Sequence, residues 1–150
     1  MKLVTGKELS SLLSTLKNES NLSVNEDSIT ISSEKILEVC EFLKEDPKSS
    51  FDYLNSITAV DYIDHFEIIY HICSTKLRKH TVLRVTLFGR ENLSIPSVIS
   101  VWNGADYQER EIWDLMGIFF NGHPNMKRLL LWEGFPGHPL RKDFIDTRKS

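Results

Sequence analysis

Cysteine is scarce in this 150-residue chain, and the spacing of its two cysteines argues against several kinds of metal site. Cys40 and Cys73 form no CxxC pair, and neither has a histidine at ligand spacing. Iron–sulfur clusters and structural zinc ions are held by sets of closely spaced thiolates and imidazoles. We therefore expect both cysteines to be small buried residues of a protein from a reducing compartment.

Long apolar runs and glycine-rich nucleotide-binding patterns are missing as well. No run approaches the ~20 residues that cross a bilayer, and the longest apolar patches, such as Phe66–Ile72, have the size of a strand. The N-terminal segment contains no signal-peptide core, and no Rossmann fingerprint or internal repeat is present. These features predict a soluble intracellular chain that meets a membrane only through a partner.

Charge is distributed unevenly along the chain. The net charge is −3, which argues against nucleic-acid binding. Residues 123–150 carry six basic and three acidic side chains, whereas the preceding 122 residues carry 12 basic and 18 acidic ones. A basic tail on an acidic body is typical of a segment that meets an acidic surface, although a merely solvated terminus has the same composition.

Two helices and a hairpin are predicted in the first third of the chain. Thr5 and Glu8 have capping-box spacing, and leucines at helical spacing follow until Asn18–Ser20. Alternating apolar residues on either side of the turn at residues 25–28 predict a β-hairpin. A second helix is expected from Ser33 to Pro47, with an apolar stripe of Ile36, Val39, Cys40 and Leu43.

The residue pattern in the middle third of the chain predicts a sheet and two short helices. Residues 51–60 form a loop that leads into a strand, and residues 66–73 and 80–88 are rich in β-branched residues, which predicts two neighbouring strands. Pro96 suits the first turn of a short helix over residues 97–101. A further helix is expected over residues 106–115, with Gly117 as its C-terminal cap.

Beyond Phe120 the periodicity fails, and the segment from 121 to 150 combines two compositions that rarely occur together. Glycine and proline recur, yet large apolar side chains are frequent, namely Leu129, Leu130, Leu131, Trp132, Phe135, Leu140 and Phe144. Free disordered tails are usually poor in such residues. We therefore expect an extended arm that lies on a surface, and a partner is favoured because residues 1–120 can form a core without the arm.

A dense group of charges, Glu109, Arg110, Glu111 and Asp114, lies in the last predicted helix. Arg110 and Asp114 are four residues apart and can form an ion pair. Glu111 and Asp114 are three residues apart, so the two carboxylates can converge and act as an acid–base pair. No nucleophile or phosphate-binding loop accompanies them, which favours an ion-pair network that holds the helix to the arm or to a partner.

Two histidine–proline pairs and one charged triplet complete the candidate site. His123 and His138 each stand between a glycine and a proline, and further metal ligands at regular spacing are missing. We expect each imidazole to bond a backbone group or a carboxylate instead. Arg141, Lys142 and Asp143 are suited to a buried ion pair at an interface, because a guanidinium binds a carboxylate with two hydrogen bonds.

These segments carry a family resemblance. Glu109–Met116 (EREIWDLM), followed by His123 and by the Lys127–Leu129 triplet, resembles the signature of the C subunit of NADH-quinone oxidoreductase, the respiratory complex I. Gly137–Phe144 (GHPLRKDF) is similar to a second block of that family, and further likeness lies in residues 51–62 and 66–71. The resemblance covers roughly residues 30–146, and its first block is long and therefore specific.

The resemblance implies an α+β fold, a two-layer domain with helices packed on a mixed, mostly antiparallel sheet. Residues 1–120 would form the domain and residues 121–150 an extended C-terminal arm. The chain would be a structural subunit of a proton-translocating complex at the cytoplasmic face of the membrane. It would bind no cofactor itself, since NADH, FMN, iron–sulfur clusters and quinone belong to the complex. Its arm would embrace the D subunit, close to the B and I subunits.

The site expected from this resemblance contains no catalytic, cofactor-binding or metal-binding residue. The residues expected to shape the arm and bind a partner are Glu109, Arg110, Glu111, Asp114, His123, Lys127, Arg128, His138, Pro139, Arg141, Lys142, Asp143 and Phe144. Residues 130–135 are less acidic than is usual in the family. Because energy-converting hydrogenases and ferredoxin-dependent complexes use related subunits, such a complex is one alternative, and a small hydrolase using Glu111 and Asp114 is another.

Overall fold

The computed structural model describes residues 1–16, 21–132 and 134–145, and it contains one main sheet, a small second sheet and three α-helices. The elements in chain order are β1 (Lys2–Leu3), α1 (Gly6–Leu13), β2 (Asn21–Val24), β3 (Ser28–Ile31), the 3₁₀ turn η1 (Ser33–Lys35), α2 (Ile36–Glu45), β4 (Tyr53–Asp61), β5 (His65–Ser74), β6 (Lys79–Phe88), β7 (Ser94–Pro96), α3 (Ala105–Met116) and β8 (Phe119–Asn121).

The main sheet is mixed and mostly antiparallel, which confirms the predicted α+β class. Its strands follow the order β2-β3-β6-β5-β4, and the short β1 also pairs with β6. The pairs β2/β3, β4/β5 and β5/β6 are antiparallel, whereas β1 and β3 run parallel to β6. The long β4–β5–β6 meander is therefore the frame on which the rest of the chain packs.

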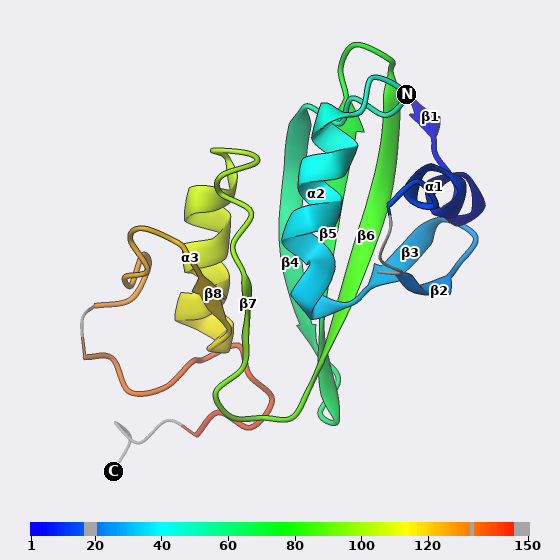
Figure 1. Cartoon of the computed structure of the whole chain (residues 1–150). Helices are drawn as coiled ribbons and strands as arrows, with labels where there is room; N and C mark the ends of the chain where they lie inside the picture. The colour runs from blue at the N-terminus through cyan, green and yellow to red at the C-terminus, as the bar shows by residue number, and fades with distance from the viewer. Residues whose placement is uncertain (17–20, 133, 146–150) are drawn as a thin grey trace.

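Helix α2 lies across one face of this sheet, and α3 lies with β7 and β8 beyond the β4 edge (Figure 1). Alternate residues of β5, from Phe66 to Ile72, are fully buried on the covered face. They meet the predicted stripe of α2, whose four residues are also fully buried. The main hydrophobic cluster is drawn from residues 4–120, and Met126 of the arm packs against it.

The first helix begins where predicted but is shorter. The Glu8 N–H donates to the Thr5 hydroxyl at 3.2 Å, which confirms the N-cap. The helix ends at Leu13 because the hydroxyls of Ser14 and Thr15 bond back to carbonyl oxygens of the last turn. The predicted end at Asn18–Ser20 lies outside the described residues.

The predicted helix over residues 97–101 is wrong. Ser94–Pro96 instead forms β7, which pairs in parallel with β8. The Ser97 N–H donates to the Asn121 carbonyl, and the Val98 N–H donates to the Glu109 carboxylate. Only a turn follows, in which the Val101 and Trp102 N–H groups both donate to the Val98 carbonyl. Strands of three residues are too short to show a period of two, which is why the sequence did not reveal β7 or β8.

The last part of the chain contains no helix or strand in the described residues 122–132 and 134–145. This arm leaves β8, loops past α3 and returns to the end of the sheet where the β4–β5 turn lies (Figure 1). Among the described helices, none is long and apolar enough to cross a membrane. The division of the chain after residue 120 stays a prediction.

Candidate functional site

Asp114 on α3 is the main anchor of the arm. Its side chain is fully buried, and its Oδ1 accepts a hydrogen bond from Arg128 at 2.8 Å. Its Oδ2 accepts the backbone N–H groups of residues 129–131 at 3.3, 2.7 and 2.9 Å. Burial alone would raise the pKa of Asp114, but these donors outweigh it and lower that pKa below its usual value. One ionised carboxylate therefore fixes a whole turn of the arm.

Arg128 links this anchor to the next turn of the arm. Besides the Asp114 carboxylate, its guanidinium donates to the Asp114 backbone oxygen at 2.7 Å. It also donates to the carbonyl oxygens of Phe135 and Gly137, both at 2.9 Å. A planar guanidinium can serve several acceptors at fixed angles, which a lysine cannot do. Arg128, which the sequence predicted to shape the arm or bind a partner, thus joins two turns of the arm to α3.

His138 completes the anchor at the C-terminal end of α3. Its Nδ1–H donates to the Asp114 backbone oxygen at 3.0 Å, and its ring lies 5.1 Å from that of Trp113. Burial lowers the pKa of His138, which keeps the imidazole neutral. Gly117, the left-handed cap with φ +77, leaves room for this ring, because a Cβ there would lie 2.7 Å from its Cδ2 atom.

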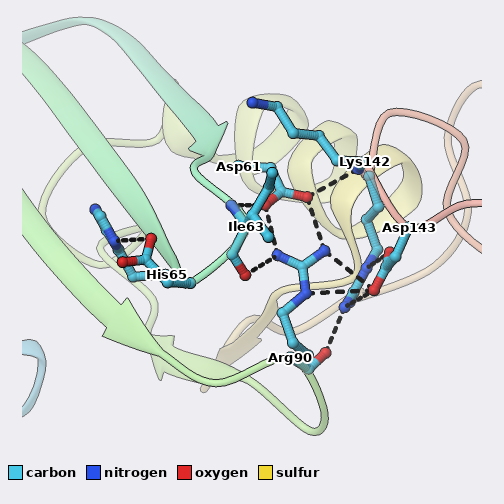
Figure 2. A network of polar contacts seen from close by, with 8 residues as sticks. Asp61, Ile63, His65, Arg90, Lys142 and Asp143 are labelled. Carbon is cyan, nitrogen blue, oxygen red and sulfur yellow. Dashed lines mark hydrogen bonds and ion pairs between the residues drawn. The ribbon is translucent and has the colours of Figure 1, made fainter.

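A second anchor, which we call the clasp, consists of Asp61, Arg90, Arg141, Lys142 and Asp143. Figure 2 labels all of these residues except Arg141. Asp61, at the end of β4, is 4% exposed and receives Arg90 at 2.9 Å and the Lys142 N–H at 2.8 Å. Arg90 also lies 3.0 Å from Asp143. Hydrogen bonds from Arg90, together with backbone N–H donors, hold the pKa of Asp61 well below its usual range.

The guanidinium groups of the clasp lie over the core. Arg90 and Arg141 lie 4.7 and 5.2 Å from the ring centre of the fully buried Phe66. Arg141 also donates to the Arg90 backbone oxygen and, at 2.9 Å, to Asp143. Stacking on an aromatic face adds to the ion pairs at a site partly screened from water. The clasp therefore ties the end of the arm to the sheet.

Glu109 serves the fold rather than the arm. Its fully buried carboxylate accepts the Ser97 hydroxyl and, at 3.0 Å, the Val98 N–H, and so fixes the loop after β7. Burial raises the pKa of Glu109 to about 7, although both hydrogen bonds act in the opposite direction. This pKa differs sharply from that of Asp114 on the same helix.

The remaining predicted residues take simpler positions. The Arg110–Asp114 ion pair is not formed, because Asp114 is taken by Arg128 and Arg110 donates to the carbonyl oxygens of Lys127 and Arg128. Glu111 is exposed, so it does not share the buried environment of Asp114 that an acid–base pair would need. Lys127 is exposed and Pro139 half-buried, while the ring of Phe144 stacks on that of Phe135 at 6.3 Å.

His123 makes the contact that the sequence predicted for the histidine–proline pairs. Its Nδ1 accepts the Asn125 N–H at 3.0 Å, so the proton lies on Nε2. Nε2 lies 3.0 Å from Asp106 Oδ1 and 3.2 Å from the Asp106 backbone oxygen. Within the described part of the chain, no group of three or more His, Cys, Asp or Glu residues is arranged to hold a metal ion.

Sequence reasoning missed the two residues at the centre of the clasp. Asp61 stands in the block 57–62 that carried the family resemblance, and this was a usable signal. Arg90 follows a glycine in a loop and carried no signal. Its partners Asp61 and Asp143 lie 29 and 53 residues away along the chain, a separation that no local pattern reveals.

Four large apolar side chains of the arm are exposed. Leu130, Trp132, Leu140 and Ile145 are 61%, 59%, 59% and 78% exposed. A groove of about 860 Å³ runs between the arm and the loop after β6, and Trp113, Phe119 and Phe144 are among its lining residues. Exposed apolar side chains on a backbone held by two buried anchors are typical of a docking surface.

The comparisons with known proteins point to one family. Residues 29–150 match the model of the family described as respiratory-chain NADH dehydrogenase, 30 Kd subunit. The chain is 41% identical over 119 residues to the C subunit of the NADH-quinone oxidoreductase of Roseiflexus sp. (strain RS-1), which covers 77% of this chain and 68% of that protein. It is 47% identical over 119 residues to that of Rhodopseudomonas palustris (strain TIE-1), covering 77% and 57%.

A third relative extends the match over most of the chain. The corresponding NADH-quinone oxidoreductase protein of Rhodopseudomonas palustris (strain BisB18) is 37% identical over 142 residues, 93% of this chain and 70% of that protein. Matches with these three relatives thus span 57–70% of the relatives' own lengths.

A solved structure shares the fold. It is a chain from the structure of the membrane-bound sulfane sulfur reductase, an archaeal respiratory membrane complex, with a TM-score of 0.74 and 22% identity over 95% of this chain and 86% of that one.

Proposed function

We propose a role for this chain on the basis of its family, since the chain belongs to the family of the respiratory-chain NADH dehydrogenase 30 kDa subunit. In this role it is a structural component of a proton-translocating NADH-quinone oxidoreductase. It docks onto the D subunit, which contributes to the quinone site, and onto the cluster-bearing B and I subunits, at the cytoplasmic face of the membrane. It contributes surfaces and no redox group of its own.

The observation that carries the proposal is the set of exposed apolar side chains on the anchored arm. Leu130, Trp132 and Leu140 stay 59–61% exposed in the isolated chain, yet the buried Asp114 anchor holds the arm that presents them. A preorganised arm loses little conformational entropy when it binds. Tryptophan is one of the residue types that contribute most of the binding energy at protein interfaces.

Two further observations support a role without a redox group. Cys40 is fully buried in the core, and its burial raises the pKa of the thiol, which makes it a poor metal ligand. Asp114, one of the two carboxylates of the candidate acid–base pair, uses its oxygens to hold Arg128 and three backbone N–H groups. Neither group is free to react.

Trp132→Ala tests the docking role. Removal of an exposed aromatic anchor should weaken assembly about tenfold or more, since such anchors contribute ~2 kcal/mol or more to binding. The tagged full-length chain is expressed in its own host, solubilised from membranes in mild detergent and purified, and the co-purifying proteins are identified by mass spectrometry. Tyr53→Ala is the matched control, because Tyr53 is 54% exposed at the end of β4 that lies far from Asp61.

The result expected is recovery of the wild type and of Tyr53→Ala with cluster-bearing and NADH-oxidising subunits, and loss of that recovery for Trp132→Ala. Recovery of the wild-type chain only as a monomer would exclude the proposal. Recovery with nickel-binding hydrogenase subunits would assign the chain to an energy-converting hydrogenase instead.

A further inference from the structure

The turn between β4 and β5 exposes a compact apolar surface, which we call the tip and define as Tyr62, Ile63, His65 and Phe88. Tyr62, Ile63 and Phe88 are 46%, 65% and 76% exposed. The rings are ordered against each other, since Tyr62 stacks on His65 at 4.9 Å and His65 lies 5.9 Å from Phe88. Tyr62, His65 and Phe88 thus form one row of rings at the end of the sheet, and Ile63 adjoins Tyr62 in the turn.

Ile63 is in a conformation that its residue type disfavours. Its φ is +76°, in the left-handed region, where a side chain branched at Cβ clashes with the backbone. Glycine or asparagine would fit this turn with less strain and would remove an apolar side chain from water. The stability of the chain itself therefore gives no reason for an isoleucine at this position.

The clasp holds this strained turn in place (Figure 2). The Ile63 N–H donates to the buried Asp61 carboxylate at 2.8 Å, and Arg90 donates to the Ile63 carbonyl oxygen at 3.0 Å. Both polar groups of the Ile63 backbone are thus satisfied by the residues that also bind the arm. A strained residue fixed by its surroundings is characteristic of functional sites.

We propose that the tip is a second docking surface, which inserts into an apolar pocket on a neighbouring protein of the same respiratory complex. The inference rests on the proposed function and adds a contact outside the arm. The tip is continuous with the arm, because Asp61 and Arg90 bind Ile63 on one side and Lys142 and Asp143 on the other. The last part of the arm and the tip lie at the same end of the molecule (Figure 1).

The tip also specifies the chemistry of its partner. Its apolar groups need a pocket lined by aliphatic or aromatic side chains. Asp64 stands beside them with its side chain 81% exposed, and it pairs with His65 at 2.8 Å. A basic side chain at the rim of the pocket would complement this carboxylate. Because the clasp fixes both surfaces, a partner that binds the tip also receives the arm in a defined position.

Ile63→Asn distinguishes an effect on binding from an effect on folding, because it should reduce assembly without lowering the melting temperature. Asparagine tolerates the left-handed conformation, so the melting temperature of the isolated full-length chain should stay the same or rise. Assembly, measured by the same co-purification, should fall about tenfold because the apolar contact is lost. Phe88→Thr, which keeps a β-forming residue in β6, should reduce assembly in the same way.

Leu77→Asn is the matched control, since Leu77 is 41% exposed in the β5–β6 turn at the opposite end of the same strands. It should assemble like the wild type. If the wild type assembles, and Ile63→Asn and Phe88→Thr assemble equally well, this inference is wrong while the proposed function stands. If the wild type does not assemble, the proposed function itself fails.

Two other possible binding partners of the tip, a second copy of this chain and a lipid surface, are distinguished by measurements on the isolated chain. A concentration-dependent dimer in analytical ultracentrifugation that Ile63→Asn abolishes would assign the tip to a second copy of this chain. Sedimentation with phosphatidylglycerol vesicles that Ile63→Asn abolishes would assign it to the lipid surface. Either outcome would overturn the inference.

Discussion

At the scale of single residues, two buried carboxylates on α3 lie in opposite environments. Asp114 is surrounded by donors that favour its ionised form, whereas Glu109 lies in the core with two donors and its pKa is raised to about 7. A raised pKa means that the folded chain binds the proton more tightly than the unfolded chain does. The free energy of unfolding contributed by Glu109 is therefore present below pH 4.5 and is lost as the pH rises towards 7.

Glu109→Gln should remove this decrease in the free energy of unfolding with rising pH. The amide can accept the Val98 N–H and donate to the Ser97 hydroxyl, so the loop after β7 keeps both contacts. Relative to the wild type, the variant should gain on the order of 3 kcal/mol between pH 4.5 and 7, where the unpaired charge no longer has to be buried. Urea unfolding at a series of pH values measures this difference, and a difference that does not change with pH would show that Glu109 is not desolvated.

At the scale of elements, the end of α3 depends on one glycine. Gly117→Ala should lower the free energy of unfolding by about 1–2 kcal/mol through its positive φ. It should also displace His138, because the new Cβ would lie 2.7 Å from the imidazole. Gly104→Ala at the other end of α3 is the control, since φ there is −62° and no atom lies within 4 Å of the added Cβ. Equal effects of the two substitutions on melting temperature would contradict this account.

The elements also show what the sequence could predict. The capped helix at Thr5, the stripe of α2, the β5 and β6 strands and the cap at Gly117 each follow from a local pattern, and the structure confirms them. The parallel β7/β8 pair depends on residues 25 apart, so the local pattern around Pro96 predicted a helix instead. For the same reason the charges of the arm were predicted as a group, while their partners Asp61 and Arg90 were not.

At the scale of the whole molecule, the core and the arm are held by different forces. The core is a hydrophobic cluster, whereas the arm is held mainly by three carboxylates, Asp61, Asp114 and Asp143, whose pKa values are all lowered. A lowered pKa stabilises the folded state above the unfolded value of 3.8 and loses that effect as the pH falls below it. Acid should therefore release the arm before it unfolds the core.

Pepsin provides the measurement, since it cleaves at leucine and aromatic residues and is active in acid. As the pH falls below about 3.8, the first cuts should appear between Leu129 and Ile145, while β5 and β6 stay intact. Asp114→Asn should expose the arm even near neutral pH, because it leaves Arg128 without its anion, and chymotrypsin, which is active at neutral pH and cleaves at aromatic and leucine residues, measures this. Asp52→Asn is the control, because Asp52 also has a lowered pKa but binds Thr75, away from the arm. Simultaneous cleavage of arm and sheet would show that the two unfold as one unit, and the clasp and the Asp114 anchor would then belong to the stability of the core.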